Sequence, residues 1–194
     1  MLMYGIPNYR FPKDRLDEDM NAILSTGNIE VIYNVNVGVD ISIEEVRNSH
    51  DAMYVAIGAQ VGKKLRMEGA DAENVFSAVE MLDQIGHGNR PDYTGKTVCV
   101  IGGGNVAIDC AKTASRFGAA KVSMVCLEDR PTMPASKNEI AEALEEKIEI
   151  CNSWGPKEVK VDENGHVTAI VFKKCLRTID PETKKFSPVY DENE

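Results

Sequence analysis

The feature that most constrains this chain is an apolar strand pattern that leads directly into a glycine turn and then into a helix pattern. The strand pattern covers residues 96–101, the helix pattern 104–117, and a second strand pattern 121–127. The turn between the first strand and the helix reads Gly102-Gly103-Gly104-Asn105-Val106-Ala107, which has the form G-x-G-x-x-A. Strand, turn, helix and strand in this order are typical of a parallel α/β unit.

Each small residue of the turn has a physical reason to be there. Gly102 permits a sharp turn out of the strand. Gly104 has no Cβ, so the backbone can approach a pyrophosphate, and the small Ala107 lets the helix pack closely on the strand. The free N–H groups of the first helical turn then point at the phosphates. Residues 96–130 are therefore expected to bind the pyrophosphate of a nicotinamide dinucleotide; the alternative is a decayed fold that keeps the turn and binds nothing.

An acidic residue, Glu128, stands at the end of the second strand pattern, 24 residues after Gly104. A carboxylate there can accept hydrogen bonds from the adenosine ribose hydroxyls, and it would repel a 2′-phosphate. Arg130 could reach a 2′-phosphate instead, and Glu128 could equally be a solvated charge at a strand end. The sequence therefore favours NAD(H) slightly and leaves NADP(H) open.

Charge and hydropathy exclude several classes of partner. The net charge is −9 and the pI about 4.9, and an acidic surface repels nucleic acid and anionic lipid. No apolar run approaches the roughly 18–20 residues that span a bilayer. The first residues also lack the layout of a signal peptide. We expect no nucleic acid partner, no membrane insertion and a cytoplasmic location.

Cysteines and histidines give no sign of a metal site. None of the cysteines forms a C-x-x-C pair, which argues against structural zinc, an iron–sulfur cluster in this chain and a disulfide framework. His50, His87 and His166 are widely spaced and fall in expected loops, so we expect surface histidines. The carboxylates of 139–149 fit the solvated face of a helix. No catalytic side chain and no metal ligand is therefore predicted.

The remaining patterns fill in an α/β fold. Residues 4–12 are expected to be extended, 14–25 helical, 29–33 a short β-run and 51–57 a buried strand. A capping box at Ser42 and Glu45 predicts a short helix through Val46. Residues 60–72 are typical of a crossover, 75–76 of a short strand, 77–85 and 137–147 of helices, and 129–136 of a loop. Strands at 157–161, 167–174 and 186–190, with turns at Asn164-Gly165 and Asp180-Pro181, predict an antiparallel β-meander.

Several motifs in order resemble one family. They are GIPNYRFPK at 5–13, AIGAQ at 56–60, VIGGGNVAIDCA at 100–111 and MPAS at 133–136, followed by the acidic EIAEALEE. Together they resemble the glutamate synthase small (beta) subunit and its relatives, which are FAD-dependent NAD(P)H oxidoreductases. Dihydropyrimidine dehydrogenase carries a similar module. The resemblance covers nearly the whole chain.

The resemblance implies two nested Rossmann-like domains in a glutathione-reductase-like arrangement. Residues 1–60 would be a partial FAD-binding domain and 61–194 a Rossmann-like NAD(P)-binding domain with its antiparallel β-meander. The chain looks like a piece of a longer protein, because the family's own FAD glycine fingerprint has no counterpart here. Gly58 and Ala59 would lie where a family turn approaches FAD, with Ile57 in place of the usual Thr. We expect the chain alone neither to hold FAD stably nor to be active.

The resemblance also assigns individual roles. Asn105 would orient the loop or touch the nicotinamide half, and Asp109 would bond nearby backbone or a positive group. Met133 would lie near the nucleotide as a wall, or in a simple Pro-kinked loop. Where NADPH-using relatives carry Tyr-Arg-Arg, this chain has Cys126-Leu127-Glu128, which favours NADH because the arginines that would clamp a 2′-phosphate are missing.

The function implied for the intact parent is electron transfer from NAD(P)H to FAD. The electrons would then pass onward, by way of iron–sulfur clusters, to a redox partner subunit or domain, of which glutamate synthase is one case. The alternatives are a stand-alone, non-enzymatic dinucleotide-binding or sensing module, and a structural remnant that binds no nucleotide.

Overall fold

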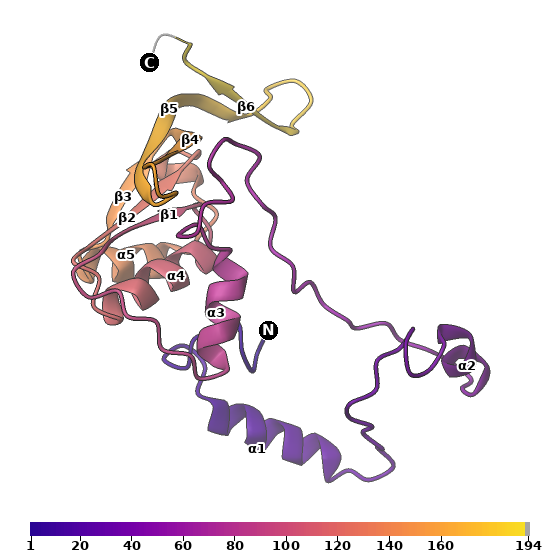
Figure 1. Cartoon of the computed structure of the whole chain (residues 1–194). Coiled ribbons are helices and arrows are strands. Elements are labelled where there is room, and N and C mark those ends of the chain that lie inside the picture. The colour runs from indigo at the N-terminus through magenta and orange to yellow at the C-terminus, as the bar shows by residue number, and fades with distance from the viewer. Residues whose placement is uncertain (193–194) are drawn as a thin grey trace.

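The computed structural model describes residues 1–192 and contains two three-stranded sheets. In the first, β1 (Thr97–Ile101), β2 (Lys121–Cys126) and β3 (Glu149–Asn152) pair in parallel in that order. In the second, β4 (Trp154–Val161), β5 (Val167–Ile179) and β6 (Phe186–Tyr190) pair antiparallel. Figure 1 shows the second sheet at one end of the molecule.

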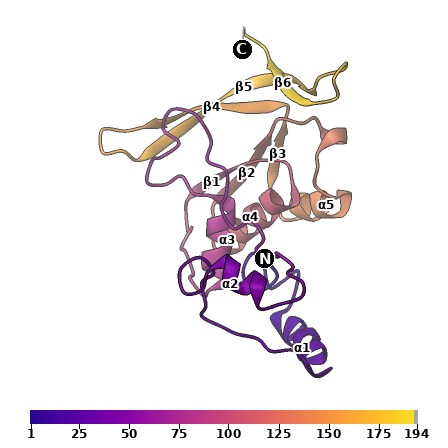
Figure 2. The same ribbon diagram turned by 90° about the vertical axis from the view of Figure 1, so that its right-hand side faces the viewer.

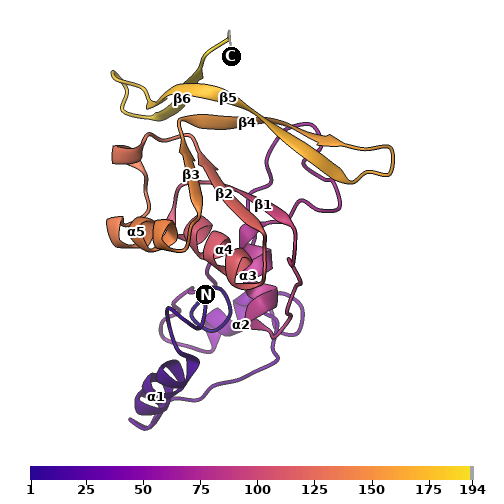
Figure 3. The ribbon, with the colours of Figure 1, turned by 90° about the vertical axis from the view of Figure 1, so that its left-hand side faces the viewer.

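Helices cover one side of the parallel sheet. They are α3 (Ala78–Gly86), α4 (Asn105–Arg116) and α5 (Lys137–Glu145), and the antiparallel sheet lies across the opposite side (Figure 3). Side chains alternate between the two faces of a strand. Val98 and Val100 of β1 accordingly pack toward the helices, whereas Cys99 lines an apolar hollow that Trp154 and Phe172 also line.

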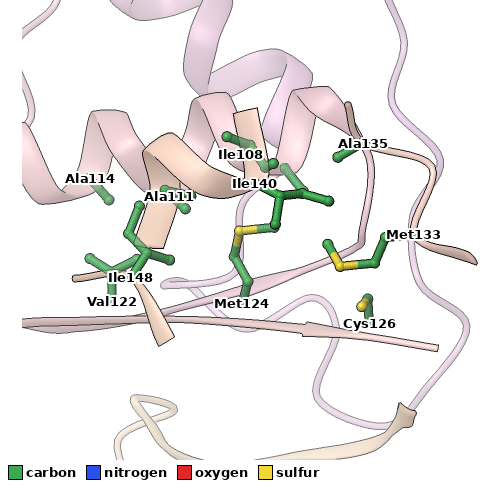
Figure 4. Close-up of a cluster of buried hydrophobic side chains, with 12 residues drawn as sticks. Ile108, Ala111, Ala114, Val122, Met124, Cys126, Met133, Ala135, Ile140 and Ile148 are labelled. Atoms are coloured by element: carbon green, nitrogen blue, oxygen red, sulfur yellow. The ribbon is translucent and has the colours of Figure 1, made fainter. Parts of the chain in front are cut away.

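The core lies between the parallel sheet and α4 and α5. Ile108 of α4, Met124 of β2 and Ile148 before β3 are 2% exposed or less. Figure 4 shows their side chains meeting between the helices and the strands. Burying an aliphatic side chain of this size contributes about 1.5–3 kcal/mol. This packing fixes the position of α4, whose N-terminus follows the glycine turn directly.

Most of the expected elements near the glycine turn are present within a few residues of their expected bounds. The turns of the second sheet also follow the sequence. Gly165 has a φ of +81°, and the side chain of Asp180 accepts a 2.7 Å hydrogen bond from the N–H of Thr183. β3 was missed, because four residues directly after a helix give too short a pattern. β4 begins at Trp154, earlier than the expected residue 157.

The N-terminal part extends away from this body. α1 (Lys13–Leu24) and α2 (Ile43–Asn48) are present, and the expected capping box of α2 is confirmed, since Ser42 and Glu45 bond each other's backbone. Residues 28–66, called the arm below, include α2 and join neither sheet. Figure 1 shows the arm leading away from the body, and in Figure 2, seen from the side of the arm, α2 lies in front of the body.

Four expectations for this part are wrong. Residues 29–33 and 51–57 are not strands, and Ile32 and Tyr54 are 70% and 92% exposed. A strand needs a neighbour for its N–H and C=O groups, and no described residue pairs with these two segments in a sheet. Residues 75–76 are not a strand either. Residues 4–12 form turns rather than an extended run, with the N–H of Arg10 bonded to the carbonyl of Pro7.

Within residues 1–192, none of the helices combines the length and the apolar character that crossing a membrane requires.

Candidate functional site

The glycine turn between β1 and α4 has the backbone that its sequence requires. Gly102 has a φ of +138°, a conformation that other residues rarely adopt, and its N–H donates to the carbonyl of Val125 on β2 at 2.9 Å. A Cβ built on Gly102 would touch the Cβ of Ala107 at 3.5 Å. The turn is therefore fixed to the neighbouring strand at one end and to the helix at the other.

The N-terminus of α4 is open. Gly104 is its N-cap residue, no side chain caps the helix, and no acidic residue lies in its first turn. A Cβ built on Gly104 would have no heavy atom within 4 Å. The first N–H groups of a helix have no intrahelical partners and carry a partial positive charge. In a chain of net charge −9, this local arrangement can bind an anion such as a pyrophosphate.

The loop of residues 128–136 is bonded to the same turn. The N–H of Ala135 donates to the carbonyl of Gly103 at 3.0 Å, and the N–H of Ser136 donates to Oδ1 of Asn105 at 2.9 Å. Asn105 and the neighbouring Val106 are exposed. The Asn105 side chain thus connects the start of α4 to the 128–136 loop.

Glu128 begins this loop and lies against the turn. Its Oε2 is 3.1 Å from the position that a Cβ on Gly103 would occupy. Its backbone carbonyl accepts hydrogen bonds from Nδ2 of Asn152 at 3.1 Å and from the N–H of Ser153 at 3.0 Å. Asn152 was missed by sequence reasoning. A polar residue at the carboxyl end of a third parallel strand would have been the signal, but that strand itself was not recognised.

Cys126, the last residue of β2, packs against the glycine turn at Gly103. Its Cβ and Sγ are 3.0 and 3.3 Å from the Cβ position of Gly103, and Nδ2 of Asn152 donates to its Sγ at 3.2 Å. Burial raises the pKa of Cys126 to about 11, so the thiol is neutral near pH 7. It contributes packing rather than charge to the site.

Two other expected residues follow in the loop. Arg130 is exposed in the short helix η1 (Arg130–Thr132), and its Nη1 lies 4.0 Å from Sδ of Met133. Met133 is buried in the core, beside Cys126 and Ile140 (Figure 4). The Met133 side chain therefore anchors the 128–136 loop to the core.

The structure does not bring Gly58 and Ala59 into this arrangement. Both are exposed in the arm. Gly58 has a φ of +70°, and the turn is closed locally by a 2.8 Å bond from Nε2 of Gln60 to the carbonyl of Ile57.

Asp109 has the positive partner that was expected for it. Nη1 of Arg10 lies 3.0 Å from both carboxylate oxygens of Asp109, which is 6% exposed. The arginine comes from the turns at the start of the chain, 99 residues away in sequence, and no local pattern pointed to it. His50, His87 and His166 are exposed, as expected.

Comparison with known proteins identifies a family and a fold. The sequence model of the family described as "Pyridine nucleotide-disulphide oxidoreductase" matches residues 13–183. The structure is similar to that of FprA from Mycobacterium tuberculosis in complex with NADPH, with a TM-score of 0.81 at 16% identity. That match covers 98% of this chain and 57% of FprA, and it supports an α/β fold of this kind.

Curated relatives agree with the resemblance found in the sequence. The chain is 37% identical over 180 residues to "NADPH-Fe(3+) oxidoreductase subunit beta" of Geobacter sulfurreducens, covering 91% of this chain and 26% of that protein. It is 30% identical over 188 residues to "Glutamate synthase [NADPH] small chain" of Escherichia coli (strain K12), covering 92% and 39%. It is 35% identical over 150 residues to "NADP(+)-dependent formate dehydrogenase subunit beta" of Moorella thermoacetica, covering 76% and 21%. The chain thus spans well under half the length of each of these relatives.

Proposed function

Because this chain belongs to the pyridine nucleotide-disulphide oxidoreductase family, we propose that it is the NAD(P)H-binding portion of a flavin-dependent oxidoreductase. The observation that carries the proposal is the open N-terminus of α4 beside the glycine turn, with Glu128 against that turn. A pyrophosphate would take the space in front of Gly104, and the adenosine ribose would lie toward Glu128. The named relatives are oxidoreductases, which supports this assignment.

The work of these residues is to bind and orient. The N–H groups of the first turn of α4 hold the phosphates, and the Glu128 carboxylate accepts hydrogen bonds from ribose hydroxyls. FAD supplies the acceptor for the hydride when it is bound. Direct hydride transfer from a nicotinamide to a flavin would need no protein acid or base, so the residues of this chain would serve to bind and orient the nucleotide. The site accordingly consists of backbone groups and one carboxylate.

We assign residues 1–60 to part of the FAD-binding domain and 61–194 to a Rossmann-like NAD(P)H-binding domain, in a glutathione-reductase-like arrangement. The arm exposes apolar side chains in alternation, among them Val31, Tyr33 and Val35, which is typical of a strand that lacks its neighbours. Gly58 and Ala59 could serve one turn near FAD, but the G-x-G-x-x-A pattern occurs once in the chain. The residues present therefore do not fit FAD without further polypeptide. The exposed arm also counts against a module that is complete by itself.

Two observations point in opposite directions on the choice between NADH and NADPH. The relatives' names specify NADPH or NADP(+), which favours NADP(H). In this chain, however, the Glu128 carboxylate lies against the glycine turn, where we expect the ribose, and Arg130 is the sole arginine in the 128–136 loop. We propose NADH as the preferred donor, because the Glu128 carboxylate would repel a 2′-phosphate.

The partners follow from the same proposal. Two of the relatives are named as beta subunits and one as a small chain. We propose that the parent protein works in the cytoplasm and passes electrons through iron–sulfur clusters to a partner subunit or domain. Glutamate synthase is the partner only if the parent is a true small subunit.

The test is calorimetric titration of the chain with NADH, NADPH and FAD in parallel, with AMP as a control for binding through adenosine alone. We expect NADH to bind more tightly than NADPH and FAD not to bind. Tighter binding of NADPH would overturn the donor preference. Tight FAD binding with no nicotinamide nucleotide bound would mean that the glycine turn serves the other dinucleotide and would overturn the function.

A further inference from the structure

Arg10 joins the two helices that flank the glycine turn. Its Nη1 contacts both oxygens of Asp109 on α4 at 3.0 Å, and its Nη2 bonds Oε1 of Glu139 on α5. The side chains of Asp109 and Glu139 are 8% and 13% exposed. One guanidinium therefore neutralises two nearly buried carboxylates, one on each helix.

Two other cations of α4 are engaged elsewhere. Nζ of Lys112 lies 2.6 Å from Glu142, and Arg116 lies 2.7 Å from Glu146. Oε2 of Glu139 is buried and has no hydrogen-bond partner among the described residues. Without Arg10, Asp109 would keep a 3.4 Å hydrogen bond from the hydroxyl of Tyr9 but would lose its cation, and Glu139 would lose the same cation. Breaking a buried pair by removing one partner is strongly destabilising, because the remaining charge stays buried.

These two carboxylates follow the contacts that shape the site by about one turn along each helix. Asp109 is one helical turn after Asn105, and Glu139 is one turn after Ser136, whose side chain caps α5. The 128–136 loop leads directly into α5. It is bonded to the glycine turn by the N–H groups of Ala135 and Ser136. Separation of α4 from α5 at the level of Arg10 would pull on both of these bonds.

Arg10 is presented from a segment that is itself fixed. The Tyr9 ring packs on Arg116, with the guanidinium carbon 3.7 Å from the ring centroid, and on Lys112 at 5.3 Å. The Tyr4 ring stacks on His87 at 3.8 Å. The start of the chain is thus anchored on α4 and beside the end of α3, and Arg10 is preorganised to reach its partners.

We propose that Arg10 is a positioning residue of the nucleotide site. By joining Asp109 and Glu139 it holds the 128–136 loop over the glycine turn, so that the N-terminus of α4 and Glu128 face the same bound nucleotide. This inference rests on the proposed function. It assigns to the first residues of the chain, which the sequence places with the flavin half, a direct part in nicotinamide nucleotide binding.

The experiment compares Arg10→Ala with Arg15→Ala in the full chain. Arg15 is the matched control, because it forms an exposed ion pair with Glu18. NADH affinity is measured by calorimetry, and hydrogen exchange of the Ala135 and Ser136 amides by NMR. Arg10→Ala should weaken NADH binding by about tenfold or more and speed exchange at both amides. Arg15→Ala should change neither.

A rescue separates positioning from general loss of structure. The double variant Arg10→Ala/Glu139→Gln removes one of the two carboxylates that lose their cation in Arg10→Ala. The affinity for NADH and the protection of the two amides should therefore return in large part. Arg10→Lys should be intermediate, because a lysine cannot reach both carboxylates with a planar fork. Loss of affinity with unchanged exchange at the two amides, or no recovery in the double variant, would overturn the proposal.

The NADH titrations of the unmodified chain and of Arg10→Ala also separate this inference from the proposed function. If the unmodified chain binds no dinucleotide, the proposed function fails, and with it the part of Arg10 in binding. If the unmodified chain binds NADH and Arg10→Ala binds it equally well, only the inference on Arg10 fails.

Discussion

The Glu128 side chain packs closely against the backbone of Gly103. A Cβ built on Gly103 would lie 3.1 Å from Oε2 of Glu128 and 3.0 Å from the Cβ of Cys126. Packing therefore favours glycine in the middle of the turn, because β2 and the start of the loop approach the backbone closely there. The G-x-G-x-x-A pattern leaves this position free, so the pattern alone does not explain a third glycine. The same contact brings the acidic residue to the edge of the pyrophosphate turn.

Glu128→Ala is expected to weaken NADH binding by about tenfold, since a hydrogen bond to a charged group contributes about 1.5–3 kcal/mol. NADPH binding should weaken less or improve, because the carboxylate that repels its 2′-phosphate is gone. Glu145→Ala, which removes an exposed carboxylate of α5, is the control and should leave both affinities unchanged. An equal loss for the two nucleotides in a calorimetric titration would contradict the ribose role of Glu128.

Gly104→Val is expected to abolish binding of both nucleotides and to leave folding nearly intact. The φ of Gly104 is −94° and a Cβ there meets no neighbour within 4 Å, so the chain tolerates the side chain while a pyrophosphate does not.

Gly102→Val is the contrasting variant. With a φ of +138° the valine is strained, and both stability and binding should fall. Circular dichroism melting together with NADH titration distinguishes the two variants. Unchanged NADH affinity in Gly104→Val would remove the pyrophosphate from this turn.

The elements around the glycine turn could be predicted because each has a local cause. Gly102 ends a strand with a conformation that only glycine adopts readily, and Ala107 begins an apolar helical stripe. The Ser42–Glu45 capping box predicted α2 for the same reason. Such signals lie within a few residues of the element that they define.

The arm and the Arg10 contact could not be predicted, because their causes are not local. Residues 51–57 have a strand's composition, yet strand formation depends on a neighbour that no described residue provides. Arg10 and Asp109 are 99 residues apart, and an arginine in a loop has no pattern that identifies its partner. Asn152 was missed for a related reason, since its role depends on the pairing of β3 with β2.

Ile108→Ala is expected to lower the free energy of unfolding by about 2–5 kcal/mol, the usual cost of emptying a filled core position. Ile108 is fully buried between α4 and the sheet. Leu144→Ala on α5 is the comparison, because Leu144 is 48% exposed and should cost under about 1 kcal/mol. Urea unfolding followed by circular dichroism measures both. Similar costs for the two variants would contradict the described position of the core.

Two buried thiols should make stability fall at high pH. Burial raises the pKa of Cys126 to about 11 and that of Cys110 to about 12, from an ordinary value of 9.0. Above about pH 9 the unfolded chain loses these protons while the folded chain keeps them, so the unfolded state binds fewer protons and the free energy of unfolding decreases. Each thiol contributes at most about 1.4 kcal/mol per pH unit.

Urea unfolding under reducing conditions at about pH 7.5, 9 and 10.5, values chosen to span the ordinary thiol pKa of 9.0, measures this effect. Cys126→Ala and Cys110→Ala should each be less steeply destabilised between the two higher pH values than the unmodified chain, whatever their stability at pH 7.5. Lysines and tyrosines that titrate in this range are common to all three proteins, so the difference in slope isolates the thiol. Identical slopes would mean that neither thiol is kept protonated by the fold.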